Sequence, residues 1–199
     1  MNDSQVFDDL AYLRKVVEDS RRVVVDNGVG LLTWGILVVI GMILTYASVH
    51  LGLDLPSTLV WSVVIGAGWL LSIWLGWINM KRSRTRTFIQ KVLWSIWVGL
   101  GITMTIIGFV GPLTGTIAGR ACIPIISLVL GAGFFATATI HQEKLLTAAA
   151  AGWWIGGIAT MVLPGDFSFL LFAGMMTFFQ IAPGVYLYKK WKKEIKSER

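Results

Sequence analysis

Charged residues and cysteines are scarce in this chain, and both shortages limit what it can be. Only 14% of its 199 residues are charged while 55% are hydrophobic, whereas soluble domains carry about a quarter charged residues. The single cysteine, Cys122, excludes an internal disulfide and cannot form a metal cluster alone. No Asp, Glu, Lys or Arg lies deep in the long apolar stretches between Gly28 and Tyr188. Because such groups normally mark proton relays and ion pathways in membrane proteins, their absence argues against a carboxylate-driven pump.

Catalytic and metal-binding motifs are missing too. His50 and His141 fall at opposite faces of the expected membrane, so they cannot converge on one metal ion. The chain has no His-Glu-x-x-His motif, no pair of aspartates within an apolar stretch and no Gly-x-Ser-x-Gly motif. We therefore expect a protein that is not an enzyme, with no cofactor and no metal site.

What the chain does have is six apolar runs, each long enough to cross a bilayer. A hydrocarbon core of about 30 Å needs roughly 20 apolar residues per helix. The runs cover residues 29–49, 57–79, 88–111, 121–140, 145–163 and 168–188. The sequence therefore predicts an all-α, polytopic membrane protein. Its expected parts are an N-terminal helix (1–27), a six-helix transmembrane bundle (28–188) and a basic tail (189–199).

Positive charge is confined to alternate connections between the runs. Each of the 17 Lys and Arg residues except Arg120 lies in the N-terminal segment, in residues 80–91, at Lys144 or in the tail. The positive-inside rule then predicts that both termini are cytoplasmic, in an inner membrane. The net charge of +6 reflects this topology, so we expect membrane lipids rather than nucleic acid as partners.

Residues 4–25 are predicted to form an amphipathic helix before the first span. Val6, Leu10, Leu13 and Val17 recur at steps of three and four residues. Through Asp26 this segment carries six acidic and four basic residues, whereas helices that bind anionic lipid are usually basic. We therefore favour docking on protein, for example on the basic tail. An interfacial helix that simply orients the first span is the alternative.

The main cytoplasmic connection is also basic. It contains Lys81, Arg82, Arg84 and Arg86, and tryptophans flank it in both adjoining runs. Aromatic rings beside a basic loop are typical of the inner membrane interface, which makes this loop an anchor and a topology signal. The alternative is a surface that contacts a soluble partner or an acidic lipid head group.

Two patterns of small residues bear on helix packing. Residues 62–68, 127–133 and 168–174 share a serine followed by apolar residues and a closing Ala-Gly or Gly-Ala-Gly. They suggest three repeated hairpins related by an axis along the membrane normal, with chance similarity as the alternative. One face of the fifth run is lined by Ala148, Gly152, Gly156 and Thr160. Because small residues let helices approach closely, we expect this run at the centre of the bundle or at a contact in a homo-oligomer.

Four side chains are candidates for binding a ligand or lining a pathway. Gln180 lies just before Pro183, whose missing N–H predicts a kink. It is expected either to bond to a neighbouring helix or to bind something. Trp69, Trp153 and Trp154 lie deep in their runs, although tryptophan prefers interfaces. They either line a cavity for an apolar or cationic ligand or pack against the small faces.

The N-terminal part of the chain resembles a known group. Residues Leu10–Arg22, followed by Gly28–Gly30 and a span with Gly35, resemble uncharacterised bacterial six-helix membrane proteins that begin with a short cytoplasmic helix. The chain keeps Glu18 and Ser20 of that pattern but has Val-Asp-Asn where serines are usual. This resemblance implies a bacterial inner (cytoplasmic) membrane.

The three-hairpin layout, with Pro164-Gly165 in its last turn, also resembles the acid-resistance membrane protein (HdeD-like) family. Neither resemblance supplies catalytic residues. We favour a non-catalytic integral membrane protein, an accessory or regulatory subunit that engages a cytoplasmic or membrane protein through its helix, loop and tail. A small transporter or channel, such as a compact permease, is the alternative.

Overall fold

The computed structural model describes residues 28–82, 88–163 and 165–197, and the elements within these ranges are helical. In chain order they are α2 (Val29–Leu51), α3 (Ser57–Arg82), α4 (Phe88–Thr105), the π-helical turn η1 (Ile106–Val110), α5 (Gly111–Leu113), α6 (Gly119–His141), α7 (Lys144–Val162), α8 (Gly165–Met176), the π-helical turn η2 (Thr177–Ile181) and α9 (Ala182–Ser197). The amphipathic helix predicted at residues 4–25 lies outside the described residues.

Six segments are long and apolar enough to cross a membrane, which confirms the predicted multi-pass fold. They are Val29–Leu51, Ser57–Ile78, Ile89–Leu113, Gly119–His141, Lys144–Val162 and Phe167–Lys193. The third span is built from α4, η1 and α5, and the sixth from α8, η2 and α9. The first five spans end within two residues of their predicted ends.

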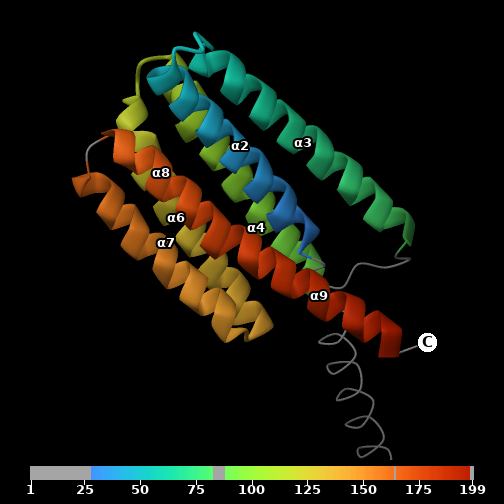
Figure 1. Ribbon diagram of the computed structural model, residues 1–199. Helices are drawn as coiled ribbons and strands as arrows, with labels where there is room; N and C mark the ends of the chain where they lie inside the picture. The colour runs from blue at the N-terminus through green and yellow to red at the C-terminus, as the bar shows by residue number, and fades with distance from the viewer. Residues whose placement is uncertain (1–27, 83–87, 164, 198–199) are drawn as a thin grey trace, which may run out of the picture.

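The last helix does not stop at the predicted boundary between residues 188 and 189. α9 continues without a break to Ser197, because no proline or glycine follows Gly184 and lysine is a good helix former. The described part of the basic tail is therefore a helical extension of the sixth span, which projects from the bundle (Figure 1).

The six spans form a closed ring in which neighbours in sequence are neighbours in space. Each span packs against the next, and α2 closes the ring by packing against α8, η2 and α9. The contact between α6 and α7 is the most extensive, and α6 also touches α8 across the ring. We call the contact between two neighbouring spans a joint. The joint between the second and third spans is the loosest, and there α3 packs mainly against η1. α3 stands at the edge of the bundle (Figure 1).

The two ends of this ring differ in charge. One end holds the start of α4, the turn at residues 142–143 and the last turns of α9, and we call it the basic end. The other end holds residues 52–56 and 114–118, and we call it the opposite end. Exposed lysines of α9 and Lys144 belong to the basic end, whereas Arg120 belongs to the opposite end.

The core lies between α6, α7 and α8. Trp153 and Phe134 are completely buried there, and Phe172 is almost so, with ring centroids 5.6 to 6.3 Å from Trp153. In the most apolar part of each span, 56% of the fourth is buried but only 6% of the third. The fourth span is thus the most buried of the six, and the third is the least buried.

Close contact between α6 and α7 depends on a glycine. A Cβ atom added to Gly131 would collide with the Trp154 indole, which lies directly over the backbone of α6. Helices in lipid associate by such packing. Lipid tails are as apolar as the side chains, so the hydrophobic effect does not drive the helices together. The α6–α7 pair therefore needs glycine at this position.

We predict that Gly131→Ala lowers the free energy of unfolding by about 1–3 kcal/mol, because an overpacked interface must shift. Gly66→Ala is the matched control, since a Cβ on this α3 glycine meets nothing within 4 Å. Unfolding in mixed micelles measures both. Equal stability of the two variants would contradict the conclusion that the α6–α7 contact requires glycine at position 131.

Candidate functional site

A side-chain hydrogen bond crosses each of the six joints of the ring. Four of the six donors are tryptophan indoles, which accounts for the deep positions of Trp69 and Trp154. Interhelical hydrogen bonds in membranes contribute about 0.6 kcal/mol each on average, so their main effect here is to fix the rotation of each helix. The bonds are Trp34–Ser72 at 2.9 Å, Trp69–Thr105 at 3.2 Å, Trp97–Thr137 at 3.1 Å, Trp154 to the Leu128 carbonyl at 3.3 Å, Ser168 to the Thr160 carbonyl at 3.4 Å and Gln180 to the Leu31 carbonyl at 3.4 Å.

Three of these tryptophans contact the neighbouring helix in the same way, at a pair of residues that we call a seat. The indole lies over a glycine, and its N–H donates to a Ser or Thr hydroxyl four residues further on. In two seats the threonine hydroxyl donates its own hydrogen to that glycine's carbonyl at 2.8 Å, which leaves its lone pairs for the indole. The seats are Gly68 and Ser72 for Trp34, Gly101 and Thr105 for Trp69, and Gly133 and Thr137 for Trp97.

The three tryptophans singled out from the sequence occupy different places. Trp69 lies between the second and third spans, edge-on to Trp34 with ring centroids 6.1 Å apart. Trp154 lies on the outer side of the α6–α7 pair beside Phe135. Trp153 is the completely buried one. They do not converge on a single cavity.

Two buried polar atoms in the core lack a hydrogen-bond partner among the described residues. They are the indole N–H of Trp153, surrounded by phenylalanine rings, and the side-chain carbonyl oxygen of Gln180, which is 3% exposed. Their helices α7 and η2 touch each other. A buried polar atom that is left unpaired costs about 1–3 kcal/mol, so each requires an explanation.

Gln180 lies within the π-helical turn η2. This turn covers the positions two to six residues before Pro183, in the segment where the sequence predicts a kink. The turn shifts the backbone just ahead of the proline, where an α-helical carbonyl would lose its donor and meet the ring. The Gln180 amide N–H donates across to the Leu31 carbonyl of α2. The same arrangement recurs in the third span, where η1 ends two residues before Pro112.

The small face predicted on the fifth span packs inside the chain for much of its length. A Cβ on Gly152 would meet the Phe179 ring, and one on Gly156 would meet Met175. Thr160 is buried and bonds to the Gly157 carbonyl at 2.7 Å, whereas Ala148 is exposed. Most of this face is therefore occupied by the sixth span.

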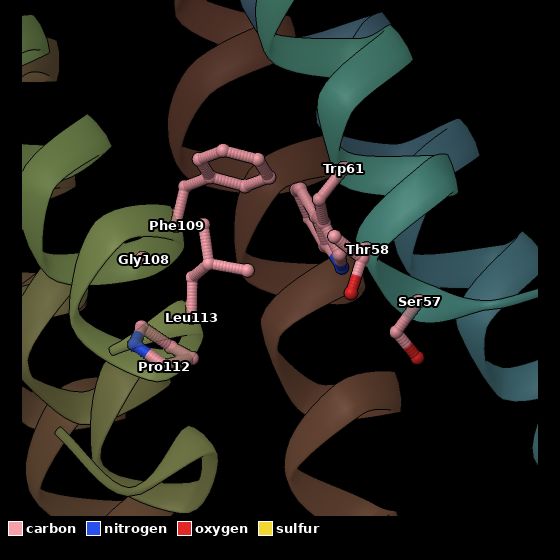
Figure 2. A pocket seen from close by; sticks show the side chains of 7 residues that line it. All are labelled: Ser57, Thr58, Trp61, Gly108, Phe109, Pro112 and Leu113. Atoms are coloured by element: carbon pink, nitrogen blue, oxygen red, sulfur yellow. The ribbon is translucent and has the colours of Figure 1, made fainter. Parts of the chain in front are cut away.

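A groove opens at the loose joint between the second and third spans, towards the opposite end (Figure 2). Its volume is about 340 Å³, near the lower limit of ligand pockets. One wall comes from the start of α3 and the other from η1 and α5. The α3 wall is Ser57, Thr58 and Trp61, and the other wall is Gly108, Phe109, Pro112 and Leu113. None of these lining side chains is charged.

The sequence pointed to Gln180, Trp69, Trp153 and Trp154 but missed two tryptophans and the groove. Trp34 and Trp97 each seat on a glycine followed four residues later by a hydroxyl, and that Gly-x3-Ser/Thr spacing was available as a signal. The groove had none, because it depends on how far two helices diverge. The side chains of Lys81, Arg82, Arg84 and Arg86 lie outside the described part of the chain.

We predict that Gln180→Leu leaves the free energy of unfolding unchanged or raises it by about 1 kcal/mol. The variant loses one interhelical bond of about 0.6 kcal/mol but removes an unpaired buried oxygen whose cost is larger. Thr137→Val is the contrasting variant, because it strands the Trp97 N–H and should cost about 1–2 kcal/mol. A marked loss of stability in Gln180→Leu would mean that its carbonyl oxygen has a partner.

Comparison with known proteins adds no relative to this geometry. The chain matches no protein-family model, no curated protein and no solved structure. Among the described residues, no three or more His, Cys, Asp or Glu side chains lie together in a group that could hold a metal ion. The interpretation of the site therefore rests on its own residues.

Proposed function

We propose that this protein is a non-catalytic membrane module whose basic end engages an acidic partner protein. The observation that carries the proposal is the helical extension of α9. It begins in the packed bundle, where Pro183, Gly184 and Leu187 are buried, and it continues as one helix to Ser197. A surface on such an extension is held in a fixed direction by the bundle.

The extension presents positive charge and is braced on one side. Lys190 pairs with Glu143, which belongs to the turn between α6 and α7. The rings of Tyr188 and Trp191 stack with centroids 5.9 Å apart. The remaining lysines of the described extension are exposed: Lys189, Lys192, Lys193 and Lys196. An ordered row of free lysines favours an acidic protein surface, by charge complementarity.

The described part of the chain starts beside this extension, at Gly28. Gly28 packs against the backbone of Gly184 and the side chain of Leu187, and its positive φ of 64° suits glycine. The chain before Gly28 carries six acidic and four basic residues through Asp26. We propose that this segment and the α9 lysines act together in binding the partner, either side by side or with the segment covering the lysines until the partner displaces it.

The topology proposed with this function is the one predicted from charge. The basic end faces the cytoplasm of a bacterial cell, and the opposite end faces the periplasmic side. Lys91, Lys144 and the α9 lysines at one end, against Arg120 at the other, support this orientation. Homo-oligomerisation and contact of the 81–86 loop with lipid head groups stay predictions.

Equivalent contacts in the first two hairpins support the proposed three-hairpin repeat. In the first hairpin Trp34, which precedes Gly35, lies against Gly68. In the second, Leu100 precedes Gly101 and lies against Gly133. In the third, the residue before Gly157 is Gly156, which lies against Met175 next to Gly174. The residue before the first glycine thus meets the closing glycine of the repeat in the first two hairpins, whereas in the third the contact falls on Met175, one residue past Gly174.

The partner proposal predicts charge-dependent association. Purified in its native lipids, the parent protein should carry a second protein in stoichiometric amount in native mass spectrometry. Lys192→Glu combined with Lys193→Glu should remove it, and deletion of residues 2–24 should remove it while the bundle stays folded. Lys144→Glu is the control, because Lys144 is an exposed lysine at the same end but not on α9. A parent that carries no second protein, or association insensitive to both the double substitution and the deletion, would overturn the proposal.

A small transporter is the second candidate, and the unpaired core atoms favour it. Polar groups inside a membrane bundle are costly and usually functional, and the side-chain oxygen of Gln180 and the N–H of Trp153 are unpaired inside this bundle. These two groups lie on touching elements between the first, fifth and sixth spans.

Transport predicts that Gln180→Leu and Trp69→Ala change solute flux in proteoliposomes while the protein remains assembled. Ser62→Ala serves as the control, since this exposed hydroxyl bonds only to its own helix at Thr58. Unchanged flux in both variants, or no flux in the parent with any retained small molecule as solute, would exclude this candidate.

A further inference from the structure

The groove between the second and third spans combines an apolar channel with unused hydrogen-bond donors. Phe109, Pro112 and Leu113 form one wall and Trp61 stands across from them (Figure 2). The far edge of the Trp61 ring packs beside Gly41 of α2, with ring atoms 3.4 and 3.5 Å from where a Cβ would stand. This contact fixes the ring and turns its N–H edge away from α2.

The donors on the α3 wall are free because of their place in the helix. Hydroxyls in the middle of a span bond to the carbonyl four residues earlier, as Thr103 does to Gly99 at 2.9 Å. Ser57 and Thr58 occupy the first turn of α3, where no helical carbonyl lies four residues upstream. Within the described residues, the Trp61 N–H and the Ser57 and Thr58 hydroxyls have no hydrogen-bond partner.

The depth of these donors identifies the part of a lipid that they would meet. Ser57 is the first residue of the second span, and Trp61 lies about one helical turn further in. Tryptophan at this level marks the membrane interface, where the ester groups of glycerolipids join their acyl chains. Indole N–H is a donor only, so it needs an acceptor such as an ester carbonyl oxygen.

The size and charge of the groove narrow the ligand further. A volume of about 340 Å³ is at the small end of ligand pockets, which hold about 300–1,000 Å³, so it holds a segment of one chain rather than a whole lipid. The lining residues carry no charge, so the phosphate must lie outside. Both neighbouring walls continue into lipid-facing surface through Leu59 and Val63 of α3 and Val110 of η1, which gives a lipid in the bilayer direct entry.

We propose that this groove is a binding site for one acyl chain of a glycerolipid from the leaflet at the opposite end. Its ester carbonyl accepts hydrogen bonds from Trp61 and Thr58, and the chain runs between Trp61 and Phe109 towards the Trp69–Thr105 bond. The bound chain fills the loosest joint of the ring, so it also acts as packing between the second and third spans. The proposal does not depend on the function proposed above.

The test compares a diacyl phospholipid with its diether analogue, which has the same chains and head group but no ester carbonyl. After delipidation in a non-ionic detergent, the parent should bind the diacyl lipid about tenfold more tightly in native mass spectrometry, the ratio given by a loss of about 1.4 kcal/mol. Trp61→Phe with Thr58→Val keeps an aromatic ring and a branched side chain on the wall but removes these two donors, and it should abolish this preference.

Two further variants keep the result interpretable. Trp74→Phe changes an indole on the same helix that is 55% exposed and outside the groove, and it should keep the tenfold preference. Leu113→Trp, at a 64% exposed position on the other wall, should fill the groove and lower affinity for both lipids without altering the donors. Equal affinity of the parent for the two lipids, or an equal effect of Trp74→Phe, would show ordinary boundary lipid only and overturn the proposal.

Discussion

The structure depends on one polar interaction that is repeated around the ring, a side-chain hydrogen bond from each span to its neighbour. In lipid, apolar side chains alone give little preference for one rotation of a helix over another, because tails and side chains are chemically alike. An indole N–H that must find an acceptor on the next helix removes that freedom. The glycine beneath Trp34, Trp69 or Trp97 then lets the two backbones approach closely enough for the bond to form.

This constraint explains which parts of the bundle are tight and which are open. The joint between α6 and α7 has both a glycine and an indole, and it surrounds the fully buried Trp153. The joint between the second and third spans has its bond at Trp69 and Thr105 and otherwise the loose packing of α3 against η1, beside which the groove lies. The groove thus lies at the joint where the two spans pack most loosely.

Sequence reasoning could predict the spans but not the partners of their side chains. A run of apolar residues has a length, and length alone predicts six crossings with bounds close to those observed. Gln180 was recognisable as an amide before a proline, yet its acceptor at Leu31 lies 149 residues away in the chain, and no local pattern encodes that distance. The π-helical turns and the groove depend on the relative rotation and tilt of helices, which packing determines. The N-terminal helix, the basic loop, the homo-oligomer and the function stay predictions or proposals.

The π-helical turn in the sixth span has a consequence far from the core. Each residue of an α-helix turns the chain by about 100°, and a π-helical turn holds one residue more than an α-helical path would. The angular position around the helix axis of every side chain after η2 is therefore shifted relative to α8. If the turn were lost, the exposed lysines of α9 would swing by about a quarter of a revolution around the helix axis, and Lys190 would leave Glu143. The direction in which the tail lysines face around the helix axis is thus determined about two helical turns before the tail begins.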